Sequence, residues 1–200
     1  MISSESPPDH KPAQRVVIRR AELEDTDTVN DAVWKVAKAS ATAAHWSRAA
    51  FHPYFGTESA SGALQAKSLF LACLNPVAHA TATIGSDNAN IATDGIVGFA
   101  AFSAILTIGA GESTLENMAV APTWQRQGIG RRLLRAGLLW CQSQAAARVF
   151  LEVRATNGAA IALYQRAGFS VVGNRPGYYR EPVEDGLQMQ KLLDPVASAG

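Results

Sequence analysis

The chain has 200 residues, of which 48% are hydrophobic and 18% are charged, and its formal net charge is +1. This balance is typical of a single globular domain and excludes disordered, collagen-like and coiled-coil proteins. The chain begins with MISSESPPDH and holds no run of about 18 apolar residues, so we expect neither a secretory signal nor a membrane span.

The first part of the chain predicts a leader followed by the start of one domain. Residues 1–14 carry three prolines and no periodic pattern, which predicts a disordered leader. We expect the domain to run from 15 to 193 and a frayed tail to follow at 194–200. A β-branched run at 16–18 predicts a strand, and the segment 25–27 predicts the N-cap of a helix whose apolar residues recur at helical spacing.

The middle of the chain predicts two buried strands. Residues 40–62 are rich in alanine and aromatic residues, and Pro53 predicts that a short helix there is broken. Apolar runs at 68–74 and 95–102 predict strands. The polar connection between them, at 75–94, is long for a hairpin.

The second half alternates strands with helices. A strand is expected at 115–120, where Pro122 stops it, and a long amphipathic helix is expected from Gly128 to about Ala147. Asn157 predicts the N-cap of a further helix that ends at Arg166. The remaining strands are expected at 149–153, 170–172 and 187–192, the last two on either side of a loop rich in proline, glycine and tyrosine.

Cysteine and histidine usage argues against disulfides and metals. Cys73 and Cys141 are the only cysteines and form no CxxC motif, so we expect reduced core thiols. His45 and His52 have no carboxylate or cysteine at ligand spacing, so no metal is expected. Together with the absence of a signal sequence, the unpaired cysteines predict a cytoplasmic protein.

The strongest local signal lies between the strand that ends at Val120 and the long helix: Gln125, Arg126, Gln127, Gly128, Ile129, Gly130 and Arg131. Unpaired N–H groups at a helix start, with the positive end of the helix dipole, bind a pyrophosphate, and glycines let the main chain approach it. Residues 121–180 hold nine arginines against one acid, which favours an anionic ligand there. Alternatively, the glycines only permit close packing.

The same segment excludes some nucleotide ligands. It has neither the Gly-Lys-Ser/Thr ending of a P-loop nor the GxGxxG pattern of a dinucleotide site. The arginine surplus is concentrated at this predicted anion site, and no RNA-binding motif accompanies it, so no nucleic-acid partner is expected.

Gln125, Gly128 and Gly130 fill the pattern Gln/Arg-x-x-Gly-x-Gly/Ala, which resembles the acetyl-CoA pyrophosphate loop of the GNAT superfamily of N-acetyltransferases. Within that superfamily, further segments are similar to the ribosomal-protein-alanine N-acetyltransferases, the RimI type, at 117–122, 151–157, 160–164, 168–169, 175–179 and 184–186. The resemblance is strong from 114 to 193 and faint from 15 to 113. It implies a single three-layer α+β domain with a central mixed, mostly antiparallel sheet, splayed near Val120 and Glu152, and helices on both faces.

The resemblance also implies the binding residues for acetyl-CoA as co-substrate. Met118, Ala119 and Val120 would offer backbone groups to the pantetheine arm, as an edge strand does to a peptide. Residues 126–131 would hold the pyrophosphate. Asn157 would reach the co-substrate with its side chain, although a simple N-cap explains it nearly as well.

Glu152 and Tyr164 match the general base and general acid of that family. Glu152 lies in an apolar strand, where a carboxylate is costly without a function or a partner, and an ion pair with Arg154 on the same face is the alternative. Tyr164 follows Asn157 by two helical turns, so both can face one site, and a core tyrosine is the alternative. Glu116 is a second candidate base, although strand alternation predicts that it and Asn117 face opposite sides.

Tyr178 and Tyr179, in the expected loop between the last strands, resemble the family's lip over an acceptor peptide; otherwise they pack on the domain. The implied function is acetyl transfer to a protein N-terminal α-amine by direct attack, with a ribosomal protein as one candidate partner. Alternatives are a small-molecule amine acetyltransferase and a non-catalytic acyl-CoA-binding module. Substrate choice is least determined, because residues 40–62 match little in the family.

Overall fold

The computed structural model describes residues 15–22, 25–40, 43–44, 46–55, 65–75, 95–105 and 111–194. The expected leader at 1–14, nearly all of the connection at 75–94, His45 and the tail beyond Asp194 lie outside these residues. Within the described part of the chain, no helix is both long enough and apolar enough to cross a bilayer.

One seven-stranded sheet organises the chain, in the order β1-β2-β3-β4-β5-β7-β6. The strands are β1 (Arg15–Arg20), β2 (Gln65–Asn75), β3 (Ile96–Ile105), β4 (Gly111–Val120), β5 (Ala146–Arg154), β6 (Ser170–Arg180) and β7 (Val183–Leu192). The helices are α1 (Thr26–Ala39), α2 (Ile129–Ser143) and α3 (Gly158–Arg166), with short 3-10 helices η2 (Arg48–Tyr54) and η4 (Pro122–Trp124). All neighbouring strands are antiparallel except the pair β4 and β5.

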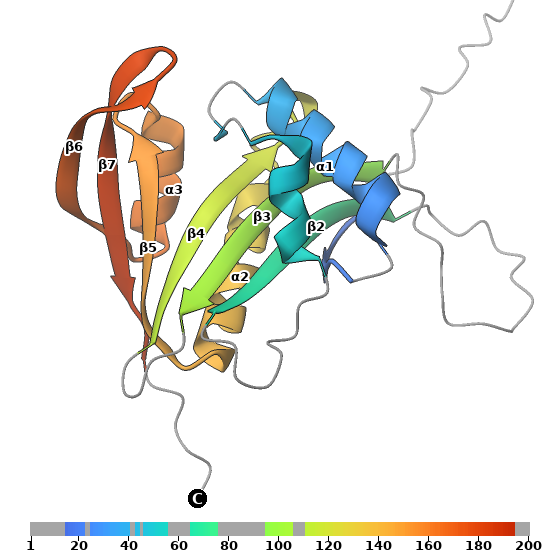
Figure 1. The fold of residues 1–200 in the computed structure, drawn as a ribbon, viewed down its shortest axis with the longest axis horizontal. Coiled ribbons are helices and arrows are strands. Elements are labelled where there is room, and N and C mark those ends of the chain that lie inside the picture. Colours follow the sequence, from blue (N-terminus) through green and yellow to red (C-terminus); the bar gives the residue numbers. More distant parts are fainter. Residues whose placement is uncertain are drawn as a thin grey trace, which may run out of the picture.

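The two parallel strands separate along their length. Their paired register ends at Leu115 and Leu151, whereas β4 continues to Val120 and β5 to Arg154. Figure 1 shows β4 and β5 close together at one end and diverging toward the other. The expected mixed, mostly antiparallel sheet with a splay near Val120 and Glu152 is confirmed.

Helices cover both faces of the sheet, as expected. Helices α1 and η2 pack on one face, around a core that includes Val33, Phe51 and Phe99. Helices α2 and α3 pack on the other face, around Leu133, Leu151 and further buried residues. Both cysteines are buried and free, as predicted from the sequence.

A β-bulge in β4 changes which face its side chains occupy. Ala101 pairs with Asn117 and Phe102 pairs with Leu115, so Glu116 is an extra residue in the strand. Leu115 packs in the α2 core, whereas the Asn117 amide reaches the backbone of Ala44 on the α1 side. Glu116 accepts a hydrogen bond from Ser103 on that same side. The expectation that Glu116 and Asn117 face opposite sides is therefore wrong, because a bulge interrupts the alternation.

Other boundaries differ from the sequence prediction for local reasons. Helix α2 ends at Ser143, before the predicted Ala147, because Ala145 adopts a left-handed conformation (φ +55°) and β5 begins at the next residue. Asp25 is the N-cap residue of α1, yet its carboxylate binds Arg19 and the N–H of Glu22 and makes no bond to the helix.

Gly137 sets how closely α2 can approach the sheet. A Cβ at this position would lie 1.9 Å from the Cε2 atom of Phe102, which is fully buried. We expect Gly137→Ala to lower the free energy of unfolding by about 2 kcal/mol, because overpacking outweighs the better helix propensity of alanine. Denaturant unfolding measures the change. Gly158→Ala is the control, since a Cβ there meets open space, and equal stability of the two variants would contradict the proposed contact.

Candidate active site

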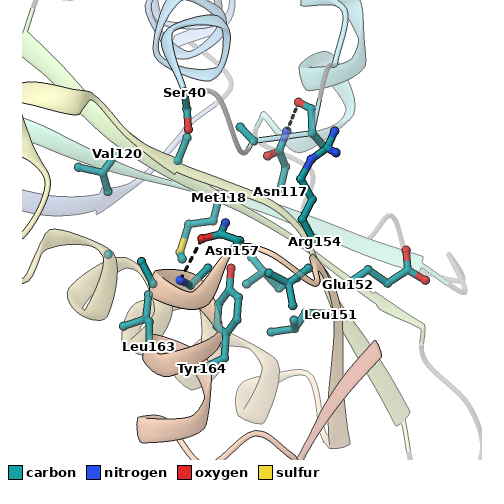
Figure 2. A pocket seen from close by; sticks show the side chains of 18 of the residues that line it. Ser40, Asn117, Met118, Val120, Leu151, Glu152, Arg154, Asn157, Leu163 and Tyr164 are labelled. Carbon is teal, nitrogen blue, oxygen red and sulfur yellow. Dashed lines mark hydrogen bonds between the residues drawn. The ribbon is translucent and has the colours of Figure 1, made fainter. Parts of the chain in front are cut away.

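The splay between β4 and β5 opens into a cavity of about 1090 Å³. One end is formed by the loop before α2, and the other end reaches Tyr178 and Tyr179 on the β6–β7 hairpin. Figure 2 shows side chains of β4, β5 and α3 that line it. Among the described residues, no group of three histidine, cysteine or acidic side chains is placed to hold a metal ion.

The loop before α2 has an unusual backbone conformation. Arg126 (φ +63°) and Gly128 (φ +77°) are both left-handed, and no side chain in the described part of the chain caps the first turn of α2. The Gln125 Nε2 atom donates to the Val120 carbonyl oxygen at 3.0 Å, which ties the loop to the end of β4. The first N–H groups of α2 are thus left to an external anion.

Six of the seven predicted loop residues line the cavity: Gln125, Arg126, Gly128, Ile129, Gly130 and Arg131. Gln127 is not among the lining residues, and its Nε2 atom instead donates to the Thr123 carbonyl oxygen at 3.3 Å. Its side chain therefore stabilises the turn.

The end of β4 offers a free backbone edge to the cavity. Met118, Ala119 and Val120 line the cavity and pair only with β3, because the register with β5 has already ended. Unpaired peptide groups at a strand edge can bind an extended ligand by adding a strand. This arrangement suits a linear ligand with amide groups.

Asn157 and Tyr164 lie beside Met118 in the cavity (Figure 2). The Asn157 Oδ1 atom accepts from the N–H of Ala160 at 3.1 Å, so Asn157 is the expected N-cap of α3 and also lines the site. Tyr164 is 7% exposed and packs edge-on against Phe169. Burial raises the pKa of the Tyr164 phenol, which therefore stays protonated at neutral pH.

Glu152 reaches the cavity from the opposite side of β5. Its neighbours Leu151 and Val153 are buried in the α2 and α3 core, so alternation directs Glu152 to the α1 side. Figure 2 shows the Glu152 side chain projecting away from Tyr164, whose hydroxyl points toward Asn157. Both line one cavity because it passes through the splay.

The ion-pair partner of Glu152 differs from Arg154, the partner that the sequence suggests. Its carboxylate forms an ion pair with Arg175 of β6 rather than with Arg154. The nearby Glu152 carboxylate is the main cause of a raised pKa of Tyr178. A carboxylate paired with a guanidinium has a defined orientation at the cavity wall.

Tyr178 and Tyr179 lie within strand β6, not in a loop, which corrects the sequence prediction. The β6–β7 hairpin is longer than expected, and its register is irregular between Arg175 and Tyr179. There, the N–H of Gly177 (φ +59°) donates to the Asp185 carboxylate at 2.8 Å in place of a backbone partner. This hydrogen bond to Asp185 satisfies the Gly177 N–H, and backbone pairing of β6 with β7 resumes at Tyr179 and Glu184.

Each of these tyrosines is covered by an arginine. The Arg175 guanidinium lies 4.2 Å from the ring centroid of Tyr178, and the Arg154 guanidinium lies 4.2 Å from that of Tyr179. The two rings meet edge to face, with centroids 5.1 Å apart. The hairpin thus presents a rigid aromatic wall to the cavity.

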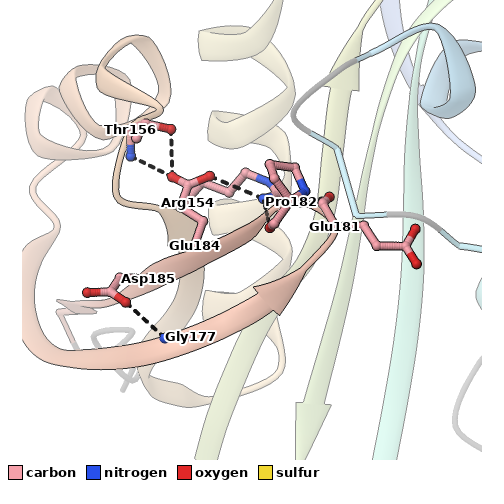
Figure 3. Close-up of polar contacts among 7 residues, drawn as sticks. All are labelled: Arg154, Thr156, Gly177, Glu181, Pro182, Glu184 and Asp185. Atoms are coloured by element: carbon pink, nitrogen blue, oxygen red, sulfur yellow. Dashed lines mark hydrogen bonds and ion pairs between the residues drawn. The ribbon is translucent and has the colours of Figure 1, made fainter.

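A buried polar network, which the sequence analysis does not predict, holds the β6–β7 hairpin in place. Arg154 is 7% exposed and donates to the carbonyl oxygens of Glu181 and Pro182 and to the Glu184 carboxylate. Glu184 also accepts from the N–H and the hydroxyl of Thr156, next to Asn157 (Figure 3). The network connects the start of α3 to the tip of the hairpin, through residues about 30 positions apart that no local motif joins.

Glu184 should make stability depend on acid pH. Its hydrogen bonds from Thr156, and then the Arg154 charge, lower its pKa below the ordinary value of 4.5. A lowered folded-state pKa stabilises the protein above the unfolded-state pKa, and this contribution is lost as the pH falls through the folded-state value. We expect the stability difference between wild type and Glu184→Gln to be largest near pH 7 and to shrink below about pH 4.

Denaturant unfolding at several pH values measures that difference. Glu112→Gln is the matched control, because Glu112 is half exposed and its ion pair with Arg148 is long, at 3.5 Å. A Glu184→Gln difference that stays constant from pH 7 to pH 3 would contradict the assigned role of the Glu184 charge.

Comparison with known families gives one consistent match. The chain matches the acetyltransferase (GNAT) family over residues 44–169. It is 47% identical over 85 residues to the ribosomal protein bS18-alanine N-acetyltransferase of Escherichia coli, a stretch that covers 42% of this chain and 56% of that protein. It is 40% identical over 96 residues to the N-alpha-acetyltransferase RimI of Mycobacterium tuberculosis, covering 48% of this chain and 59% of the relative.

The fold extends the likeness beyond these aligned stretches. The crystal structure of the Escherichia coli ribosomal-protein-alanine N-acetyltransferase superposes with a TM-score of 0.61 at 25% identity, covering 93% of this chain and 99% of that one. The sequence matches to curated relatives, by contrast, span little more than half of each relative.

Proposed function

The chain belongs to the acetyltransferase (GNAT) family, and from this premise we propose that it transfers acetyl from acetyl-CoA to the N-terminal α-amine of a protein or peptide. The observation that carries the proposal is one cavity that runs from the α2 loop, past Glu152 and Tyr164, to the tyrosine pair of the hairpin. The relatives named above act on ribosomal protein alanine or on N-terminal α-amines, which makes a ribosomal protein a candidate acceptor.

The residues of the cavity fit acetyl-CoA, which supplies an activated acyl thioester. The uncapped N–H groups of α2, with Arg126 and Arg131, suit its pyrophosphate. The free edge of β4 at 118–120 suits the amides of its pantetheine arm. Asn157 lies beside this path.

Two side chains would move protons during the transfer. Glu152 accepts a proton from the ammonium of the acceptor, directly or through one water, and the freed amine attacks the thioester carbonyl carbon. The new C–N bond forms as the C–S bond breaks, and the Tyr164 hydroxyl donates a proton to the departing thiolate. The nitrogen loses its second proton as the amide forms, and this proton restores the Tyr164 hydroxyl by way of solvent. Backbone N–H groups of β4 at 118–120 stabilise the oxygen that becomes negative. No protein nucleophile is needed.

Removing the Tyr164 hydroxyl tests the proposed acid. We expect Tyr164→Phe to lower kcat by about 100-fold, because the thiolate would leave without a positioned proton. The KM for acetyl-CoA should change by less than about threefold, since the ring still fills its place against Phe169. Steady-state kinetics measures both values, and an unchanged kcat would remove Tyr164 from the proton path.

The proposed activity is tested by CoA thiol release with several acceptors. The panel holds short peptides that begin with alanine, serine, methionine or glycine, the same peptides with a blocked N-terminus and an internal lysine, and polyamines and aminoglycosides. Turnover of free peptides that disappears on blocking supports the proposal. Turnover of small amines alone would assign a small-molecule acetyltransferase. Binding of acetyl-CoA without turnover of any acceptor would favour a binding module.

A further inference from the structure

The acceptor end of the cavity is acidic, and its three carboxylates have different partners. Glu112, Glu116 and Glu152 all line this end. Glu112 lies 3.5 Å from the Arg148 guanidinium, and Glu152 is paired with Arg175. Within the described residues, no ion pair within 4 Å involves Glu116.

Glu116 is held instead by a neutral group. Its Oε1 atom accepts from the Ser103 hydroxyl at 2.6 Å. Lys67, which faces Ser103 across the strands, directs its Nζ atom over the Tyr54 ring, 4.9 Å from the centroid. The remaining acceptor positions of the Glu116 carboxylate are therefore available to a ligand without breaking an ion pair.

The next residue offers a second acceptor atom in the same cavity. Asn117 is 4% exposed, and its Nδ2 atom donates to the Ala44 carbonyl oxygen at 3.2 Å. Among the residues that the structure describes, no donor reaches its buried Oδ1 atom. A buried amide oxygen without a donor costs about 1–3 kcal/mol, so this atom indicates a missing donor.

The bulge in β4 explains why both groups serve one side of the sheet. The extra residue turns Glu116 and Asn117 together toward the α1 side, where Trp46 also lines the cavity. Trp46 packs on Tyr54, with ring centroids 5.3 Å apart. Two oxygen acceptors beside aromatic rings form a site that is complementary to an ammonium or guanidinium group.

The place of Glu116 along β4 suggests which part of the acceptor reaches it. Glu116 precedes Met118 by two residues, at most about 7 Å along the strand because of the bulge, and Met118 begins the β4 edge that is proposed to hold the thioester. An extended peptide advances about 3.3 Å per residue, and a lysine or arginine side chain adds further reach. The second or third acceptor residue can therefore place its charge at Glu116.

We infer that Glu116 and the Asn117 Oδ1 atom form a subsite for a lysine or arginine side chain at the second or third position of the acceptor peptide. This subsite rests on the proposed function and adds a specificity that the function does not require. It also gives Glu116 a binding role distinct from that of the base, Glu152.

Matched peptides test the subsite. All begin with alanine, and they carry lysine, glutamine or glutamate at position two or at position three. For the wild type, we expect kcat/KM to be about tenfold higher with lysine than with glutamine, mainly through KM. Glu116→Gln should bring the lysine-to-glutamine ratio near one, and Glu116→Lys should favour the glutamate peptide. Asp31→Asn is the control and should keep the wild-type ratio, because the Asp31 carboxylate is paired with Arg48 at 2.8 Å and is not among the residues that line the cavity.

Several outcomes would overturn the inference. A wild-type ratio near one, or a ratio that persists in Glu116→Gln, excludes the subsite while leaving peptide acetylation intact. A fall in kcat of equal size for all peptides in Glu116→Gln would make Glu116 a base instead. If no peptide is turned over, titration of fluorescent lysine and glutamine peptides into the CoA-saturated protein measures the same preference by binding. Equal binding of the lysine and glutamine peptides would also overturn the inferred subsite.

Discussion

Replacing Glu152 with glutamine is expected to lower kcat by about 10²–10⁴-fold with a free N-terminal peptide, the range that a positioned general base contributes. Glutamine keeps the size of the side chain and can still accept a hydrogen bond from Arg175, but it cannot take a proton. The wall of the cavity should therefore stay in place. Binding of acetyl-CoA should change by less than about threefold, because the proposed pyrophosphate site lies at the other end of the cavity.

Comparing Glu152→Gln with Arg175→Met isolates the role of Glu152 as a general base. The arginine variant removes the ion partner of Glu152 and the cation over Tyr178, yet it leaves the carboxylate present. We expect a smaller loss of kcat in Arg175→Met than in Glu152→Gln. Equal losses in the two variants would mean that Glu152 acts only as the anchor of the hairpin. Steady-state kinetics at saturating acetyl-CoA and peptide separates the two cases.

The proposed anion-binding half of the site could be predicted from the sequence because its determinants are local. A strand, a glycine turn and a helix start occupy residues 118–131, and each has a short-range signal. Six of the seven loop residues line the cavity as a result. Asn157 was predicted equally well, because an N-cap depends on a residue only three positions away.

The acceptor half could not be predicted in the same way. Strand alternation suggests Arg154 as a partner for Glu152 because the two share a strand face, whereas the structure pairs Glu152 with Arg175 and Arg154 with Glu184. These choices depend on the register of the β6–β7 hairpin, which contains an irregularity that the sequence does not mark. The bulge at Glu116 could not be predicted from the sequence either, because no glycine or proline marks its position.

The C-terminal end of α2 differs from the sequence prediction for another reason. Ala145, Ala146 and Ala147 are all strong helix formers, so propensity extends the helix to the end of the run. Tertiary packing decides otherwise, since Ala146 and Val149 are buried in β5 and the chain must turn at Ala145 to bring them there. A left-handed alanine at a helix end is uncommon, and the pairing of β5 offsets its cost.

Arg154→Met is expected to lower the free energy of unfolding by about 3 kcal/mol and to raise the KM for peptide acceptors by about tenfold. Methionine fills a similar volume but donates no hydrogen bond, so two carbonyl oxygens at the tip of the hairpin and the Glu184 carboxylate lose their donor. The Tyr179 ring also loses its cation. The hairpin should then move relative to β5, which widens the acceptor end of the cavity.

Affinity for CoA distinguishes this effect from general unfolding. It should change by less than about threefold, because Gln125 and Gln127 tie the loop at 125–131 to Val120 and Thr123 and not to the hairpin. Arg148→Met is the matched control, since Arg148 is also on β5 but makes one long, exposed ion pair, and it should cost less than about 1 kcal/mol. Arg154→Lys should fall between the two, because lysine restores the charge without the planar fork. If Arg154→Met left the peptide KM unchanged while lowering stability, Arg154 would hold the fold without positioning the acceptor.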